Sequence, residues 1–170
     1  MDVALRKKKT NNSLTVHIFG PRESGKTAFV INFCERKYDT FYIPSFNREK
    51  TEHKCVLNMK MVNINFIVDS LENYTIDDMK SSDCCLLFFD CSDFNSFSKI
   101  KEFIVSNSKE NKIKYNVPWC LVGNKNDLTV QKNNLEKIKE FSAQNNIEFF
   151  DISVRNNYGI KNDALCRFTI

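Results

Sequence analysis

The chain has 170 residues, of which 42% are hydrophobic and 27% charged, and its formal net charge is +4 at pH 7. This length fits one domain that can bury a core of ordinary size without disulfide or metal crosslinks. The composition is ordinary for a soluble globular protein. Because no secretory signal and no long apolar run is present, we expect no transmembrane segment.

The cysteines exclude two kinds of small scaffold. There are seven of them, scattered and mostly inside apolar runs, and only two histidines accompany them. Their number is odd and no CxxC pair occurs, so neither a disulfide framework nor a zinc site is expected. We expect buried free thiols in a reducing compartment, and therefore a cytoplasmic protein.

The positive charge is concentrated near the amino end. Residues 1–9 carry four basic side chains against one acidic one: Arg6, Lys7, Lys8, Lys9 and Asp2. Such a segment can touch acidic lipid or nucleic acid, but a solvated arm is the simpler interpretation. No basic face or aromatic RNA-binding motif follows it, so nucleic-acid binding is not expected. We predict a disordered arm at residues 1–13 and a single domain at residues 14–170.

The first half of the chain alternates strand-like and helix-like segments. Residues 14–20 form an apolar, β-branched run that ends in glycine, and residues 26–37 have the pattern of a helix. Residues 53–59 and 62–69 alternate apolar and polar side chains, which is typical of half-buried strands. The short gap between them predicts a hairpin, and hence one antiparallel edge strand.

The second half continues this alternation. We predict strands at residues 84–90, 119–125 and 147–153, and helices at residues 94–107, 134–144 and 160–168. The run CCLLFFD at residues 84–90 is continuously apolar, as in a central strand that is buried on both faces. The order favours an α/β fold: a mostly parallel six-stranded sheet with helices on both faces. Ligands bind such sheets at the carboxyl ends of the strands.

The segment GPRESGKT, residues 20–27, has the GxxxxGK[ST] pattern of a phosphate-binding loop. It lies between a predicted strand and a predicted helix, which is the context that the motif requires. Backbone N–H groups and the positive end of the helix dipole surround the phosphates. Lys26 reaches the β- and γ-phosphates, and the Thr27 hydroxyl binds Mg²⁺. The loop alone does not choose among adenylate-type kinases, ATPases and GTPases.

The segment NKND, residues 124–127, follows a predicted buried strand. Guanine presents two adjacent donors, and the Asp127 carboxylate can accept both, whereas adenine would leave the carboxylate unpaired. Asn124 would tie this segment to the phosphate loop, and the stem of Lys125 would cover the base. An ATP-using kinase is disfavoured by this motif and by the lack of room for a lid.

With SVR at residues 153–155, the chain resembles the Ras superfamily of small GTPases, and its switch I segment YIPS looks like that of Rab or Ras proteins. The resemblance spans residues 14–170 and implies a phosphate-loop NTPase G domain that binds GDP or GTP with Mg²⁺. It assigns the backbone N–H of Val154 to guanine O6. The nucleotide contacts that the motifs and the resemblance indicate are Arg22, Glu23, Ser24, Gly25, Lys26, Thr27, Ala28, Tyr38, Asn124, Lys125, Asp127, Ser153, Val154 and Arg155.

The family's switch I contributes a hydroxyl to the metal, and its equivalent here is Ser45. The resemblance therefore implies Thr27, Ser45 and Asp69 as the Mg²⁺ residues, with Asp69 acting through water. It also implies that Tyr38 stacks on the edge of the base. Arg155 replaces the family's lysine and keeps an aliphatic cover.

Switch II departs from the family pattern Asp-x-x-Gly-Gln. This chain reads DSLEN, so Glu72 stands at the glycine that contacts the γ-phosphate, and Asn73 stands at the glutamine that orients water. Arg22 replaces a glycine of the phosphate loop, where a bulky side chain obstructs hydrolysis; a role as a finger in cis is the weaker alternative. No catalytic residue is therefore assigned.

These departures leave two functions open. One is a small GTPase with weak or very slow hydrolysis that regulates membrane traffic or signalling; the other is a pseudo-GTPase scaffold that holds GDP without switching. Effectors or exchange factors would contact residues 38–50 and 69–80. Cys166 is the fifth residue from the end in CRFTI, which is not a CaaX prenylation box, so we expect either that the sequence is truncated after the last helix or that membrane anchoring is absent or borrowed. A cytoplasmic protein, peripheral on membranes at most, is expected.

Overall fold

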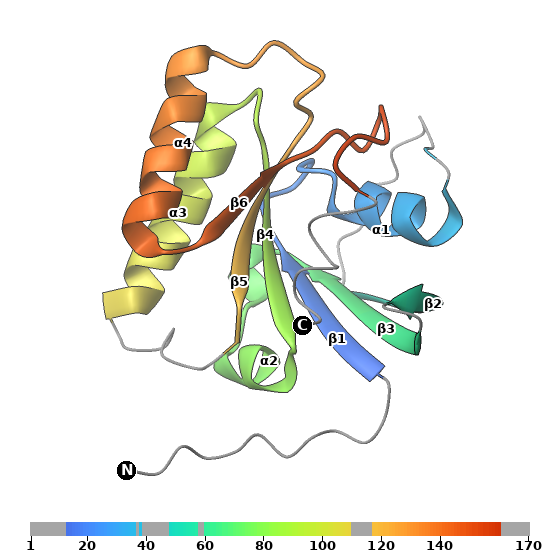
Figure 1. Ribbon diagram of the computed structural model, residues 1–170. Helices are drawn as coiled ribbons and strands as arrows, with labels where there is room; N and C mark the ends of the chain where they lie inside the picture. The colour runs from blue at the N-terminus through green and yellow to red at the C-terminus, as the bar shows by residue number, and fades with distance from the viewer. Residues whose placement is uncertain (1–12, 37, 39–47, 58–59, 110–116, 161–170) are drawn as a thin grey trace.

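The computed structural model describes residues 13–36, 38, 48–57, 60–109 and 117–160. In this part of the chain six strands form one sheet, in the order β2-β3-β1-β4-β5-β6 (Figure 1). The strands are β1 (Ser13–Phe19), β2 (Glu49–Leu57), β3 (Lys60–Asp69), β4 (Cys84–Asp90), β5 (Trp119–Asn124) and β6 (Glu148–Asp151). Only the β2–β3 pair is antiparallel. The predicted mostly parallel sheet with an antiparallel edge strand is confirmed.

Helices cover both faces of the sheet, as predicted. They are α1 (Lys26–Glu35), α2 (Ile76–Ser81), α3 (Phe94–Lys109) and α4 (Lys132–Asn145), with a 3₁₀ turn, η1, at Leu71–Asn73. Helix α1 lies on one face, and α3 and α4 lie side by side on the other (Figure 1). None of the helices in the described ranges has both the length and the hydrophobicity that a bilayer crossing needs. Residues 1–12 of the arm predicted at residues 1–13, and most of the predicted last helix, lie outside the described residues, whereas Ser13 is the first residue of β1.

Several boundaries differ from the sequence-based prediction by a few residues, and those of α1 and β2 have a structural reason. Helix α1 ends at Glu35 because Arg36 adopts a left-handed conformation, φ 57°, and its N–H donates to the Asn32 carbonyl at 2.8 Å. Strand β2 begins at Glu49 rather than residue 53, because its pairing with β3 continues to Val68. The elements η1 and α2 were not predicted; they fill the connection from β3 to β4.

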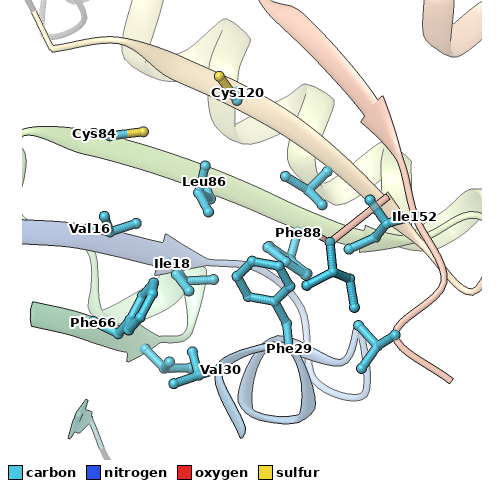
Figure 2. Packing of buried hydrophobic residues seen from close by; sticks show 14 of the residues in the cluster. Val16, Ile18, Phe29, Val30, Phe66, Cys84, Leu86, Phe88, Cys120 and Ile152 are labelled. Carbon is cyan, nitrogen blue, oxygen red and sulfur yellow. The ribbon is translucent and has the colours of Figure 1, made fainter. Parts of the chain in front are cut away.

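The core consists of two hydrophobic layers, one on each face of the sheet. Strand β4 contributes to both, because successive side chains of a strand point to opposite faces. Cys84, Leu86 and Phe88 lie in the layer under α1 (Figure 2). The alternate positions Cys85 and Leu87 lie in the layer under α3 and α4. The buried side chains thus account for the continuous apolar run of β4 and hold its carboxyl end rigidly.

His17 of β1 is a buried polar side chain on the face opposite α1. Its ring stacks on Phe19 with centroids 4.3 Å apart, and its Nδ1 lies 3.3 Å from the Ser82 hydroxyl. In the described part of the chain its Nε2 has no hydrogen-bond partner. Burial lowers the pKa of His17 to about 4, although the carboxylates of Asp78 and Asp69 act against this shift.

The low pKa of His17 predicts a loss of stability in mild acid. The unfolded chain binds a proton near pH 6.5, whereas the folded chain does so only near pH 4, so the free energy of unfolding falls as the pH drops between these values. The loss attributable to this ring reaches at most about 3 kcal/mol. Urea unfolding from pH 7 to pH 4 should show a smaller decline in His17→Gln than in the wild type. Parallel declines would contradict the assignment.

Candidate functional site

The predicted motifs meet at one edge of the sheet. In the register of the parallel strands, Phe19 at the end of β1 is opposite Asp69 at the end of β3, and Asp90 of β4 is opposite Asn124 of β5. The loop of residues 20–25 leaves β1 at this edge and enters α1. The carboxyl ends of these strands therefore bring together the phosphate-loop motif, the base motif and the predicted metal carboxylate.

The phosphate loop has the conformation that its sequence indicates. Gly25 has φ 91°, and a Cβ at this position would lie 2.2 Å from Asn124 Nδ2, so both the backbone angle and the space require glycine. Glu23 also has a positive φ, 62°. The Ser24 hydroxyl donates to the Pro21 carbonyl at 2.9 Å and stabilises the turn. Arg22 and Glu23 are exposed, while Thr27 and Ala28 are partly buried at the start of α1.

Lys26 crosses the loop from the first turn of α1. Its ammonium donates to the carbonyls of Gly20 at 2.8 Å and Pro21 at 2.7 Å. Burial lowers the pKa of Lys26 to about 8, and the carboxylates of Asp69 and Glu72, among others, partly oppose this shift. A desolvated ammonium whose direct partners are neutral carbonyls is stabilised by an anion, so the loop favours a phosphate as an additional partner.

Asn124 joins the two ends of the candidate nucleotide site. Its side chain is 3% exposed; Nδ2 donates to the Ser24 carbonyl at 3.0 Å, and Oδ1 accepts the Val154 N–H at 3.1 Å. One amide therefore connects the phosphate loop with the SVR segment. The N–H predicted to meet guanine O6 is in contact with Asn124 here, so a base would have to share it or replace this contact.

The neighbouring groups of the base motif are also held in place. The Ser153 hydroxyl donates to Asp127 Oδ1 at 2.5 Å. Asp127 is exposed, and this bond does not use its second carboxylate oxygen, Oδ2. Lys125, at φ 64°, forms an ion pair with Asp90 at 2.7 Å. Arg155 is exposed. The structure thus brings Asn124, Asp127 and the SVR segment together, whereas Lys125 contacts β4.

Thr27 and Asp69, two of the predicted metal residues, both lie at this edge and both contact side chains from the start of β2. The Thr27 hydroxyl donates to Glu49 Oε2 at 3.0 Å, and Arg48 Nε donates to Asp69 Oδ2 at 2.7 Å. A hydroxyl and a carboxylate are oxygen ligands of the type that Mg²⁺ binds, so these residues fit the metal chemically. Ser45, the third predicted residue, lies outside the described residues.

The other oxygen of Asp69 is also occupied. Its Oδ1 accepts hydrogen bonds from Asn73 Nδ2 and from the Ser70 N–H, both at 2.8 Å. Burial of Asp69 favours its neutral form, but the hydrogen bonds from Arg48, Asn73 and Ser70 outweigh it, and the pKa of Asp69 is lowered. Asp69 is therefore an anion that the protein itself stabilises.

In switch II, the position at which the family pattern has a glycine is occupied by Glu72, which lies in the 3₁₀ turn η1. The Asn73 amide, predicted at the water-orienting position, donates to Asp69 as described. Glu72 is exposed, but its charge acts on Lys26. Tyr38, predicted to stack on a base, is 44% exposed. The roles assigned to these three residues stay predictions.

Four residues of the site were missed by sequence reasoning: Arg48, Glu49, Asp78 and Asp90. Asp90 ends the apolar run CCLLFFD and so had a signal, because polar residues at strand ends mark the ligand edge. Arg48 and Glu49 had none, because they precede the segment predicted as a strand. Asp78 lies in α2, which was not predicted.

The fold and this edge define a phosphate-loop α/β domain of the G-domain type. A family model described as the Ras family matches residues 15–166. Mouse and human Ras-related protein Rab-21 are each 24% identical over 155 residues, covering 88% of this chain and 68% of the relative. Ras-related protein RabN1 of Dictyostelium discoideum is 25% identical over 172 residues, covering 90% of this chain and 79% of the relative. The chain belongs to the Ras family.

The bridge made by Asn124 predicts a stability loss that needs no nucleotide. In Asn124→Ala the Ser24 carbonyl and the Val154 N–H lose their partner, so the free energy of unfolding should fall by about 2 to 4 kcal/mol. Chemical denaturation of the nucleotide-free protein measures this change. Asn126→Ala is the matched control in the same turn and should change stability by about 0.5 kcal/mol or less. Equal effects of the two substitutions would contradict the bridging role.

Proposed function

We propose that this protein binds GDP and GTP with Mg²⁺ and hydrolyses GTP very slowly, as a Rab-like small GTPase. The observation that carries the nucleotide assignment is the Asn124 bridge between Ser24 and Val154, residues 100 and 30 positions away in the chain. It holds a phosphate-binding loop and a guanine-type base motif at a fixed separation. Preorganised groups of this kind bind without an ordering cost.

The base selectivity of the proposed site rests on the Asp127 carboxylate. Its Oδ1 accepts a hydrogen bond from Ser153, so the side chain is oriented before any base enters. The ring edge of guanine offers an N1–H and a 2-amino group to a carboxylate, whereas adenine offers no such pair. An adenine nucleotide would leave the carboxylate unpaired, and such mismatches reduce binding strongly.

Slow hydrolysis is supported by switch II. A residue that orients the attacking water must be able to turn toward it, but one N–H of the Asn73 amide donates to Asp69 at 2.8 Å, which restrains that side chain. The Glu72 carboxylate adds negative charge beside a site for a polyanion. Both features favour a hydrolysis rate below the intrinsic rate of the family, which is of order 10⁻⁴ s⁻¹.

A second candidate function is a GDP-holding scaffold that does not switch. The same contact between Asn73 and Asp69 favours this function, because the contact holds the start of switch II in place when no γ-phosphate is bound. The two functions differ in their relative affinity for di- and triphosphate.

The proposal includes a role in membrane traffic or signalling, which the Rab relatives support. Effectors or exchange factors would contact residues 38–50 and 69–80, and the location would be cytoplasmic or peripheral on a membrane.

Paired affinities test the proposal. For the slow GTPase, we expect nucleotide-free protein with Mg²⁺ to bind GDP and guanosine 5′-(β,γ-imido)triphosphate with affinities that differ by less than a factor of 100, about 2.7 kcal/mol. Glu72→Gly should bring the affinities for the two nucleotides closer together, because glycine gives the backbone more freedom and the negative charge of Glu72 is removed. Glu72→Gln is the matched variant that removes only the charge and separates the two causes.

Each outcome has a distinct meaning. Similar tight binding of both nucleotides would show that the γ-phosphate fits, and would favour the slowly switching GTPase. A strong preference for GDP that Glu72→Gly does not narrow would favour the scaffold. Binding of neither nucleotide would overturn the assignment of both motifs, and tighter binding of ATP than of GTP would overturn the assignment of Asp127.

A further inference from the structure

Two consecutive residues, Arg48 directly before β2 and Glu49 at its first position, contact the two predicted metal residues that the structure describes. Glu49 accepts the Thr27 hydroxyl hydrogen bond at 3.0 Å, and Arg48 donates to the Asp69 carboxylate at 2.7 Å. The β2–β3 register places this segment there, since Glu49 is opposite Val68, the residue before Asp69. One short segment therefore occupies both sides of the candidate metal position.

The contact of Arg48 with Asp69 is one half of a clamp. The same guanidinium donates from Nη1 and Nη2 to the two oxygens of Asp78, at 2.9 and 2.8 Å. Bidentate pairs of this type are the strong and geometrically specific ones. Asp78 belongs to α2 and also accepts hydrogen bonds from the backbone N–H and the hydroxyl of Thr75. Arg48 thus ties the start of β2 to the end of β3 and to α2.

The exposed fractions of these side chains make the clamp electrostatically important. The side chain of Asp69 is 2% exposed and that of Asp78 is 12% exposed, whereas that of Arg48 is 35% exposed. A buried carboxylate requires a cation or several donors nearby. Arg48 supplies that positive charge from the solvent side, where a metal would also approach.

We propose that Arg48 acts as an internal cation that competes with Mg²⁺ for Asp69. The inference rests on the proposed nucleotide function. The guanidinium lies 2.7 Å from Asp69 Oδ2, and its positive charge repels a divalent cation that approaches the same carboxylate, so Arg48 and Mg²⁺ oppose each other there. The metal-free arrangement is stabilised by Arg48, and Mg²⁺ acts at a higher concentration than it would without this side chain.

The clamp also couples metal binding to switch II. Because Arg48 holds Asp69 and Asp78 together, its displacement from Asp69 removes the link between the end of β3 and α2. Arg48 is thus a positioning residue, and its contact with Asp69 forms when the metal is absent and breaks when the metal binds. Mg²⁺ therefore changes the surface formed by β2 and α2, which is part of the proposed partner-binding region.

The test is the Mg²⁺ dependence of GDP release, measured with a fluorescent N-methylanthraniloyl-GDP on the full chain at a series of free Mg²⁺ concentrations. In Arg48→Gln the Mg²⁺ concentration that gives half-maximal slowing of release should fall by about tenfold or more relative to the wild type. Arg48→Lys keeps the charge but loses the forked geometry, and should lie between the two. Lys54→Gln removes an equal charge from the exposed side of β2 and should leave the midpoint unchanged within about twofold.

Asp78→Asn is the second variant, because it loosens the clamp while Arg48 and Asp69 remain. It should also lower the Mg²⁺ midpoint, by less than Arg48→Gln. A purely structural role of Arg48 would change the thermal stability and leave the midpoint in place, and this would overturn the inference. A higher midpoint in Arg48→Gln would overturn it as well, since Arg48 would then assist the metal. If the wild type binds no GDP at any Mg²⁺ concentration, the proposed function itself fails, and this inference fails with it.

Discussion

The buried amide of Asn124 is the constraint on which the candidate site depends. Its two hydrogen bonds join the carbonyl of Ser24 to the N–H of Val154, so the loops after β1 and β6 cannot move apart without breaking one of them. Both bonds lie in a buried environment, where an unpaired polar group is costly. The amide also explains the glycine at position 25, because any Cβ there would meet Asn124 Nδ2 at 2.2 Å. The phosphate loop and the base motif are therefore one structural unit.

Two kinds of contact position the site. The hydrophobic core positions the ends of the central strands, and ion pairs join the segments around Arg48. Strand β4 is buried on both faces, so the ends of β1 and β5 beside it are fixed by the core. The start of β2 and the segment η1–α2 are joined in addition by the ion pairs of Arg48 with Asp69 and Asp78. Ionic contacts at a half-exposed guanidinium respond to metal and to bound phosphate, whereas hydrophobic layers do not.

The charges at this edge bear on the proposed binding of nucleotide and Mg²⁺. The carboxylates of Glu49, Asp69 and Glu72 all act on the Lys26 ammonium, so the phosphates of the proposed nucleotide would enter a site that already contains several negative groups. Lys26 and Arg48 offset part of that charge, and the remainder favours a divalent cation alongside the phosphates. The family assignment, which rests on the match over residues 15–166, agrees with such a site but leaves its rates and partners to experiment.

The sequence by itself determined the α/β class, the antiparallel edge strand, the phosphate loop and the base motif. Each of these depends on a local pattern: the apolar run of β4, the alternation in β3, or the spacing of Gly20, Gly25 and Lys26. Only the tertiary structure decided how Asp69 is occupied. Its partners Arg48 and Asn73 come from different segments, and which of several nearby donors reaches the carboxylate depends on the β2–β3 register and on η1. Such choices among long-range partners leave no periodic signal in the chain, whereas strands and phosphate loops do.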